Sequence, residues 1–245
     1  MTPIIDLLKQ HRSIRRFKPD PVSAETLETI LSAGQCAATS SFLQGTTVVR
    51  ITAPVTRQRL ATLAGNQAYV ASAPEFLVFC ADLHRAGQCC ERHGKTAVEG
   101  YTEQFIIATV DVALMAQSVV LAAESLGLGA CYIGAIRNAP AEVAALLELP
   151  RQVYPVFGLC LGYPAETPET KPRLPLAVIV KQERYSDDND AAAIAAYDEH
   201  IREYYRKRSG NPKNQGWSEQ MAGLLGKESR PHMRAFLRDQ GFEMK

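Results

Sequence analysis

The chain has 245 residues, and 46% of them are hydrophobic, so it is long enough for one large domain or two small ones around a sizeable core. Its net charge is only +1, which leaves no overall field to recruit nucleic acid or an anionic membrane. Asp6 and Lys9 interrupt the first apolar run, so the N-terminus lacks the pattern of a signal peptide. We therefore expect a globular cytoplasmic protein that binds neither nucleic acid nor membrane.

The N-terminal part predicts two helices. Thr2 and Pro3 have the cap and first-turn chemistry of a helix start, and the apolar stripe that follows ends at His11. A second helix is predicted to begin after its cap residue, Ser23, and to carry apolar residues at helical spacing as far as Ala38.

The middle of the chain predicts strands and one long helix. Short β-branched or continuous apolar runs indicate strands at 46–51, 76–81, 154–161 and 177–180. Residues 105–126 predict a helix that is apolar nearly all round and long enough to span a bilayer. Asp111, Gln117 and Glu124 within it disfavour a membrane span. Because the helix has no polar face, we interpret it as buried in the core or in a subunit interface.

Helices at both ends with strands between them indicate an α+β fold. The composition shifts at Asp187, where an Asp-rich turn precedes an Ala-rich helix, a Gly-Asn-Pro turn at 210–212 and a helix from about Ser218. We therefore predict a core over residues 1–186 and a C-terminal excursion and tail over residues 187–245.

Four potential metal ligands crowd one segment: His84, Cys89, Cys90 and His93. Adjacent cysteines rarely both bind one tetrahedral zinc, and the spacing matches no zinc-finger pattern. We therefore favour no metal, and scattered single cysteines suit reduced thiols.

The sequence contains no nucleophile elbow, zinc-protease helix, Walker loop or dinucleotide-binding glycine pattern after a strand. Two basic clusters stand out instead, at residues 11–17 and 171–175. Arg and Lys side chains suit phosphate oxygens, so the clusters indicate a split anion site, with solvated surface charges as the alternative. A chain without a recognisable catalytic motif can still perform redox chemistry if a cofactor carries the reaction.

Four motifs occur in order: H-R-S-I-R-R-F at 11–17, S-S-F-L-Q at 40–44, Y-I-G at 132–134 and K-P-R-L-P at 171–175. Their succession resembles the nitroreductase family of FMN-dependent oxidoreductases, in particular its NADPH-dependent, oxygen-insensitive nitroreductase and flavin reductase branch. The resemblance covers nearly the whole chain. It implies a central, mostly antiparallel sheet flanked by helices, and a homodimer in which both chains build each FMN site.

The resemblance also implies roles for individual residues. Residues expected at the tightly but non-covalently held FMN are His11, Arg12, Ser13, Arg15, Thr39, Gln67, Tyr132, Ile133, Gly134, Lys171 and Arg173. Thr39 stands where serine is expected, which keeps the hydroxyl, and Ala135 stands where a second glycine is common. Gln67 could instead be a surface polar residue.

Ser41, Phe42 and Arg230 are expected to line the substrate side of the flavin, and Arg208 to contact the 2′-phosphate of NADPH. The alternatives are a core aromatic role for Phe42 and a solvated helix face for Arg208. The flavin N5 atom would carry the chemistry, so the resemblance implies no catalytic side chain.

The implied activity is a ping-pong, two-electron transfer of hydride from NADPH to small-molecule acceptors such as nitroaromatics, quinones or flavins. One alternative is a dedicated NADPH-flavin reductase that supplies reduced FMN to a partner. An alternative of another class is a flavin-binding module without turnover, although Ser41 and Phe42 are not bulky charged plugs over the ring.

Overall fold

A four-stranded antiparallel sheet lies at the centre of the structure, a computed structural model that describes residues 2–210 and 212–245. The strand order is β1-β2-β4-β3, and every neighbouring pair is antiparallel, which confirms the expected sheet. The strands are β1 (Thr46–Arg50), β2 (Glu75–Asp82), β3 (Gly129–Ile133) and β4 (Val153–Gly162).

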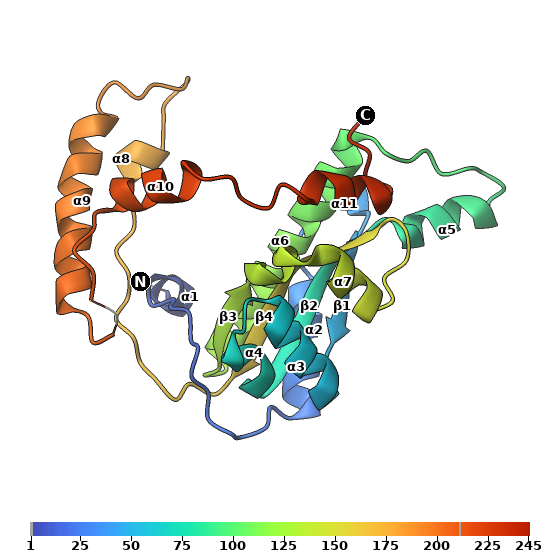
Figure 1. The fold of residues 1–245 in the computed structure, drawn as a ribbon, viewed down its shortest axis with the longest axis horizontal. Coiled ribbons are helices and arrows are strands. Elements are labelled where there is room, and N and C mark those ends of the chain that lie inside the picture. Colours follow the sequence, from blue (N-terminus) through green and yellow to red (C-terminus); the bar gives the residue numbers. More distant parts are fainter. Residues whose placement is uncertain (1, 211) are drawn as a thin grey trace. The chain divides into compact units, whose positions relative to one another are not determined.

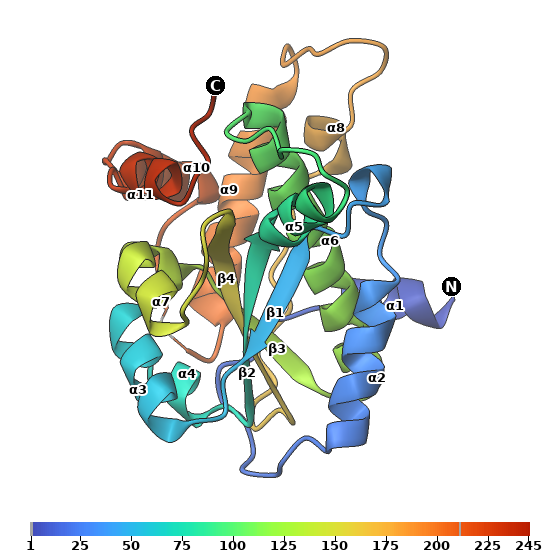
Figure 2. The same ribbon diagram turned by 90° about the vertical axis from the view of Figure 1, so that its right-hand side faces the viewer.

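Helices cover both faces of this sheet (Figures 1 and 2). On one face Leu77 and Phe79 of β2 pack in a core with α2 (Ala24–Gln35) and α6 (Thr102–Ser125). On the other face Phe76 and Val78 pack in a second core. The helices of that second face are α3 (Pro54–Leu63), α4 (Ala68–Ser72) and α7 (Pro140–Leu146). The alternation of β2 side chains therefore divides the interior into two apolar layers.

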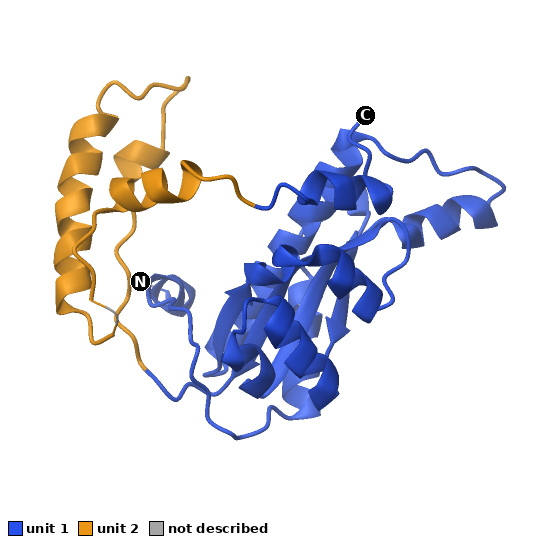
Figure 3. Ribbon diagram, viewed as in Figure 1, with its two compact units in different colours: residues 1–166, 230–245 blue, residues 167–229 orange. Residues whose placement is uncertain are grey.

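The chain forms two compact units (Figure 3). Unit 1 contains the sheet and comprises residues up to 166 together with 230–245; unit 2 comprises residues 167–229. The boundary expected at residue 187 falls inside unit 2, because the chain already leaves the sheet at Gly162, the end of β4. Unit 1 also holds α1 (Pro3–Lys9), α5 (His84–Arg92) and α11 (Met233–Asp239).

Unit 2 consists of α8 (Leu176–Ile179), α9 (Asp190–Lys207) and α10 (Trp217–Leu225). The strand predicted at 177–180 is wrong, because these residues form α8. A short apolar run fits either a strand or a helix, and the described part of unit 2 offers no strand for it to pair with. The strand β3 went unpredicted because its first residue, Gly129, together with Gly127, indicates the end of the preceding helix.

Two helix starts can be compared with their predicted caps. Ser23 Oγ accepts the Thr26 N–H at 3.0 Å, so the predicted cap of α2 is confirmed, although this helix ends before Ala38. Thr2 is the N-cap residue of α1, as predicted, but its side chain makes no cap hydrogen bond. The first-turn proline, Pro3, begins α1 as predicted.

The long helix α6 is buried on one face only. Ala108, Asp111 and Val112 lie in the interior, whereas Ile106 and Val110 are each 48% exposed. Of the described helices, α6 is the one that is long and apolar enough to cross a membrane by length and composition, and its buried face packs on the sheet instead. The expectation that this helix is buried all round does not hold within one chain.

Candidate functional site

The first basic segment is fixed against strand β3. Ser13 forms a parallel bridge with Ala130, and the Ile14 N–H donates to the Ala130 carbonyl at 2.9 Å. Ile14 is buried, and a Cβ on Gly129 would lie 2.5 Å from its Cγ1, so this close approach requires glycine. Because Ile14 points inward, the neighbouring Arg15 is exposed.

Carboxylates hold the backbone and one ring of this segment. Glu166 Oε1 accepts the N–H groups of Arg15 and Arg16 at 2.7 and 3.0 Å. His11 Nδ1 lies 2.6 Å from Glu124 Oε1 on α6, so only Nε2 of this ring could serve a phosphate. These two contacts use only the backbone N–H groups of Arg15 and Arg16.

The structure brings Arg15 and Gln67 together through a residue that the sequence did not indicate, Tyr69. The Tyr69 hydroxyl donates to Gln67 Oε1 at 2.8 Å, and Gln67 occupies the N-cap position of α4. Burial raises the pKa of Tyr69, and a nearby Cys131 thiol adds to the rise, whereas a hydrogen bond with Arg15 opposes it. Arg15, Gln67 and Tyr69 therefore form one polar cluster.

The third motif ends strand β3 and leads into a short 3-10 helix, η2 (Gly134–Asn138). The Ile133 side chain is buried, so only its backbone can reach a ligand. A Cβ on Gly134 would meet only the end of the flexible Arg137 side chain, at 3.3 Å, so the surroundings of this residue do not by themselves require glycine. Arg230 Nε donates to Asn138 Oδ1 at 3.0 Å, so the predicted substrate residue lies at the end of η2.

Residues 39–44 form a strained segment around the 3-10 helix η1 (Ser40–Phe42). Ser41, Phe42 and Gln44 all have positive φ, at 49°, 57° and 55°. Non-glycine residues in this region cost about 1–3 kcal/mol each and persist only where surrounding contacts impose them. Phe42 is 81% exposed, so its alternative role as a core aromatic is wrong.

The buried carboxylate of Asp111 holds this segment in place. The sequence had indicated this residue only as a polar position within an apolar helix. Asp111 accepts the Ser40 N–H at 3.0 Å and the Gly45 N–H at 3.3 Å. It is 1% exposed. In the same segment Thr39 Oγ1 is buried and has no hydrogen-bond partner among the described residues, which fits a hydroxyl reserved for a bound ligand.

The polar residues of unit 1 fall into two groups. The group at 39–45 is anchored to Asp111, and the group at 11–15 is anchored to Glu124, both on α6. At 1.5 Å per residue along a helix, these two anchors are about 20 Å apart. The contact of His11 and the contacts of Ser40 and Gly45 therefore lie about 20 Å apart along α6.

Unit 2 gathers the second basic cluster around one aromatic ring. The Lys171 ammonium lies 5.2 Å from the centre of the Tyr205 ring, and the Arg208 guanidinium lies 4.6 Å from it. Lys213, which the sequence analysis did not single out, is 6.0 Å away. Arg173 lies near Tyr197, whose pKa is raised by burial and lowered in part by this charge. Asn211, from the predicted turn, lies outside the described residues.

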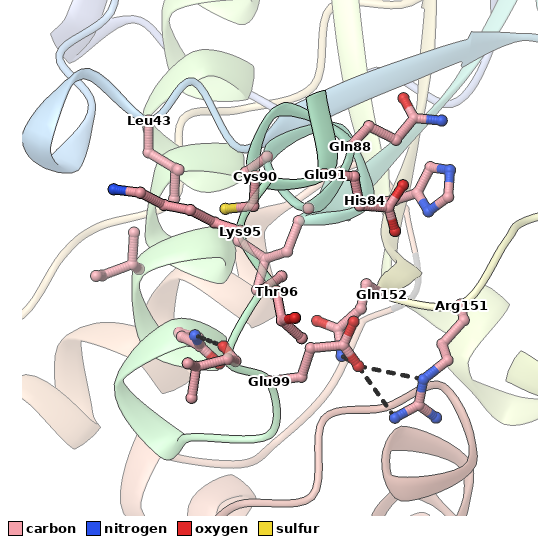
Figure 4. A pocket seen from close by; sticks show the side chains of 17 residues that line it. Leu43, His84, Gln88, Cys90, Glu91, Lys95, Thr96, Glu99, Arg151 and Gln152 are labelled. Atoms are coloured by element: carbon pink, nitrogen blue, oxygen red, sulfur yellow. Dashed lines mark hydrogen bonds and ion pairs between the residues drawn. The ribbon is translucent and has the colours of Figure 1, made fainter. Parts of the chain in front are cut away.

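A cavity of about 640 Å³ lies between α5 and the start of α6, and Leu43 of the strained segment lines one part of it (Figure 4). His84 and Cys90 line it, and on its floor Glu99 is bound by Arg151 at 3.2 Å. Within residues 2–210 and 212–245, no group of three or more His, Cys, Asp and Glu residues is arranged to hold a metal ion.

Comparisons with known proteins show which family the chain resembles. Residues 8–163 match the profile of the Nitroreductase family, and residues 171–245 match that of the Nitroreductase family, C-terminal domain. The chain is 45% identical to the oxygen-insensitive NADPH nitroreductase of Salmonella typhimurium over 99% of both chains. It is 44% identical to the NADPH-flavin oxidoreductase of Vibrio harveyi over 98% of both.

A solved structure shares the fold. It is the NADPH:FMN oxidoreductase from Vibrio harveyi complexed with NAD+, with a TM-score of 0.91, 41% identity and full coverage of both chains. The protein described here belongs to the nitroreductase family.

Proposed function

We propose that the protein is an FMN-containing oxidoreductase that uses NADPH to reduce nitroaromatics, quinones or flavins in two-electron steps. The cluster of Arg15, Tyr69 and Gln67 is the observation that carries the proposal, because it places a cation, a phenol and an amide together beside strand β3. The relatives named as NADPH nitroreductase and NADPH-flavin oxidoreductase support the same reductant and cofactor.

When bound, FMN supplies hydride-accepting and hydride-donating chemistry at its ring, which no side chain can supply. The chain's own residues bind and orient. Arg12, Ser13 and Arg15 are proposed to bind the FMN phosphate through charge-assisted hydrogen bonds, and the resemblance assigns the same role to Lys171 and Arg173. Gln67 and the backbone at Ile133 and Gly134 would fix the ring.

We further propose a homodimer in which two chains complete each site. The support is the exposed apolar stripe of α6, formed by Ile106, Val110 and Leu114, which are 48%, 48% and 44% exposed. The spacing of about 20 Å along α6 between Asp111, which holds residues 40–45, and Glu124, which holds His11, points the same way, since a second chain could supply Thr39, Ser41 and Phe42.

Arg208 is proposed to bind the 2′-phosphate of NADPH. The protein is proposed to act in the cytoplasm. Arg230, tied to Asn138, would meet the acceptor on the substrate side together with Ser41 and Phe42 of the other chain. The exposure of Phe42 leaves the proposed substrate face accessible, which disfavours a flavin-binding module without turnover.

The decisive experiment measures FMN retention in the Arg15→Ala and Lys171→Ala variants. Each lost charge-assisted contact costs about 1.5–3 kcal/mol, which is roughly ten- to a hundredfold in affinity. Arg16→Ala is the matched control, because Arg16 is a neighbouring exposed arginine outside the proposed site. If both site variants hold FMN as tightly as the parent and the control, the phosphate assignment is wrong.

A second candidate use, a dedicated flavin reductase, is favoured by the relative named NADPH-flavin oxidoreductase. Steady-state rates with NADPH against nitrofurans, quinones and free FMN separate the two uses. A kcat/KM for FMN far above that for every other acceptor identifies a flavin reductase. Comparable values identify a general nitroreductase.

A further inference from the structure

Tyr205 occupies an unusual position among the charges of unit 2. It lies in the last turns of α9 and is only 4% exposed, packed in an apolar cluster with Tyr197 and Ile201. Yet its ring has three cationic groups within 6.0 Å of its centre: Lys171, Arg208 and Lys213. Aromatic faces attract cations, and the attraction grows when the ring is shielded from water.

The phenol oxygen adds polar contacts to those of the ring. Tyr205 Oη donates to Gln220 Oε1 at 3.0 Å on α10, which fixes the ring orientation. Burial of the phenol raises its pKa, but the hydrogen bond from Lys171 and the charges of Lys171 and Arg208 outweigh burial, so the pKa lies below its usual value. The phenol and the two cations therefore interact directly.

The backbone around Arg208 is also held in place. Arg208 is the C-cap residue of α9, and its N–H donates to the Tyr204 carbonyl at 3.0 Å. The next N–H, of Ser209, donates to Glu169 Oε1 at 3.1 Å, two residues before Lys171 in sequence. The Glu169 carboxylate is the acidic group beside Arg208 in this part of unit 2. Loop 167–175 and the end of α9 are thus tied together on both sides of the ring.

We infer that Tyr205 is a positioning residue that sets Lys171 for the FMN phosphate and Arg208 for the NADPH 2′-phosphate at the same time. The inference rests on the proposed function, because that function assigns the two phosphates. One ring contacts both cations, so a change in the ring moves both binding sites. Tyr205 couples cofactor retention to nicotinamide choice without touching either ligand.

The test replaces the ring and measures binding rather than turnover. In the Tyr205→Leu holoenzyme we expect the dissociation constants of FMN and NADP+ each to rise about two- to thirtyfold, the range that a cation–aromatic contact supports. FMN release is followed by flavin fluorescence on dilution, and NADP+ binding by calorimetry. The dissociation constant of NAD+ stays unchanged, because NAD+ has no 2′-phosphate.

Two further variants separate positioning from simple loss of packing. Tyr205→Phe keeps the ring for Arg208 but removes the phenol oxygen from Lys171, so FMN is released faster while NADP+ binding stays within about twofold of the parent. This variant also removes the tyrosine that ionises below about pH 10 in an alkaline absorbance titration. Ile201→Ala removes buried volume from the same cluster without removing a cation contact, and it leaves both ligands bound as in the parent.

Double variants decide the outcome. In an Arg208→Ala background, Tyr205→Leu adds less than about twofold to the NADP+ dissociation constant, because its effect on that ligand runs through Arg208. The inference is overturned if Tyr205→Leu raises the NADP+ dissociation constant as much in the Arg208→Ala background as in the parent. It is also overturned if Ile201→Ala weakens FMN and NADP+ binding as much as Tyr205→Leu does. If Lys171→Ala and Arg208→Ala weaken binding but Tyr205→Leu does not, the positioning role is wrong while the proposed function stands. If Lys171→Ala and Arg208→Ala themselves change nothing, the phosphate assignments of the proposed function are wrong.

Discussion

Replacing Asp111 is expected to damage substrate use far more than overall stability. Asp111 is the buried carboxylate that accepts the Ser40 and Gly45 N–H groups and so closes the segment that presents Ser41 and Phe42. Asp111→Ala removes both acceptors. Asp111→Asn keeps one oxygen and turns the other position into a donor that faces an N–H.

The magnitude follows from two opposing contributions. Two hydrogen bonds to a charged acceptor contribute about 3–6 kcal/mol. Three non-glycine residues with positive φ oppose them with a total strain of about 3–9 kcal/mol. Because the two are similar, loss of the carboxylate lets the segment relax, and the net loss of unfolding free energy in Asp111→Ala is only about 1–3 kcal/mol. Misplacement of Ser41 and Phe42 by about 1 Å is expected to lower kcat/KM for acceptors ten- to a hundredfold.

The assay combines three measurements on holoenzyme. Urea denaturation gives the unfolding free energy, hydrogen exchange reports the order of the amides at 40–45, and steady-state rates with a nitrofuran give kcat/KM. Asp239→Asn is the control, because this aspartate lies exposed on α11. FMN content is expected to stay near that of the parent, and Asp111→Asn is expected to fall between the parent and Asp111→Ala.

Unchanged exchange at 40–45 together with unchanged kcat/KM in Asp111→Ala would refute the reasoning. A loss of stability well above 3 kcal/mol with an intact segment would also refute it, since Asp111 would then serve the core rather than the strained segment.

Three further predictions concern other parts of the chain. Val110→Glu places a charge on the exposed stripe of α6 and should turn the dimer into monomers in sedimentation velocity; a dimer that persists contradicts the proposed interface. Burial raises the pKa of Cys80 to about 12, so this thiol should react with Ellman's reagent only after unfolding, and rapid native labelling contradicts that. Burial acts to raise the pKa of Asp198, but hydrogen bonds from Ser218 and Trp217 hold it below its usual range. The stabilisation they give is therefore present above pH 4 or so and lost as the pH falls through the lower folded pKa. Trp217 fluorescence should report this acid transition, and Asp198→Asn should remove it; identical acid curves contradict the prediction.

Local chemistry made part of the fold predictable. Ser23 has a side chain that caps a helix by itself, and the apolar run of β2 is buried on both faces, so each could be read from a few neighbouring residues. The run at 177–180 could not, because its four apolar residues satisfy either period and only the surroundings decide.

The site shows the same limit. Arg15, which lies in the first motif, and Gln67, which lies in none, were both found by resemblance. Their meeting through Tyr69 depends on contacts between distant segments. Asp111 was visible as a polar residue within an apolar helix, which is a usable signal for a buried acceptor. Its partners are backbone groups, however, and these carry no mark in the sequence.

Helix α6 has a consequence for how this chain can change in length. Asp111 of this helix binds the strained segment at residues 39–44, and Glu124 binds His11, so the helix sets the distance between these two contacts. One inserted or deleted residue between them would shift the second anchor by about 1.5 Å and turn it by about 100° around the helix. Both anchors could not then face their partners, whereas extra residues at 93–100, which follow α5 outside any helix or strand, would leave this spacing untouched. Insertions and deletions should therefore be tolerated in that loop, whereas between Asp111 and Glu124 they should abolish function.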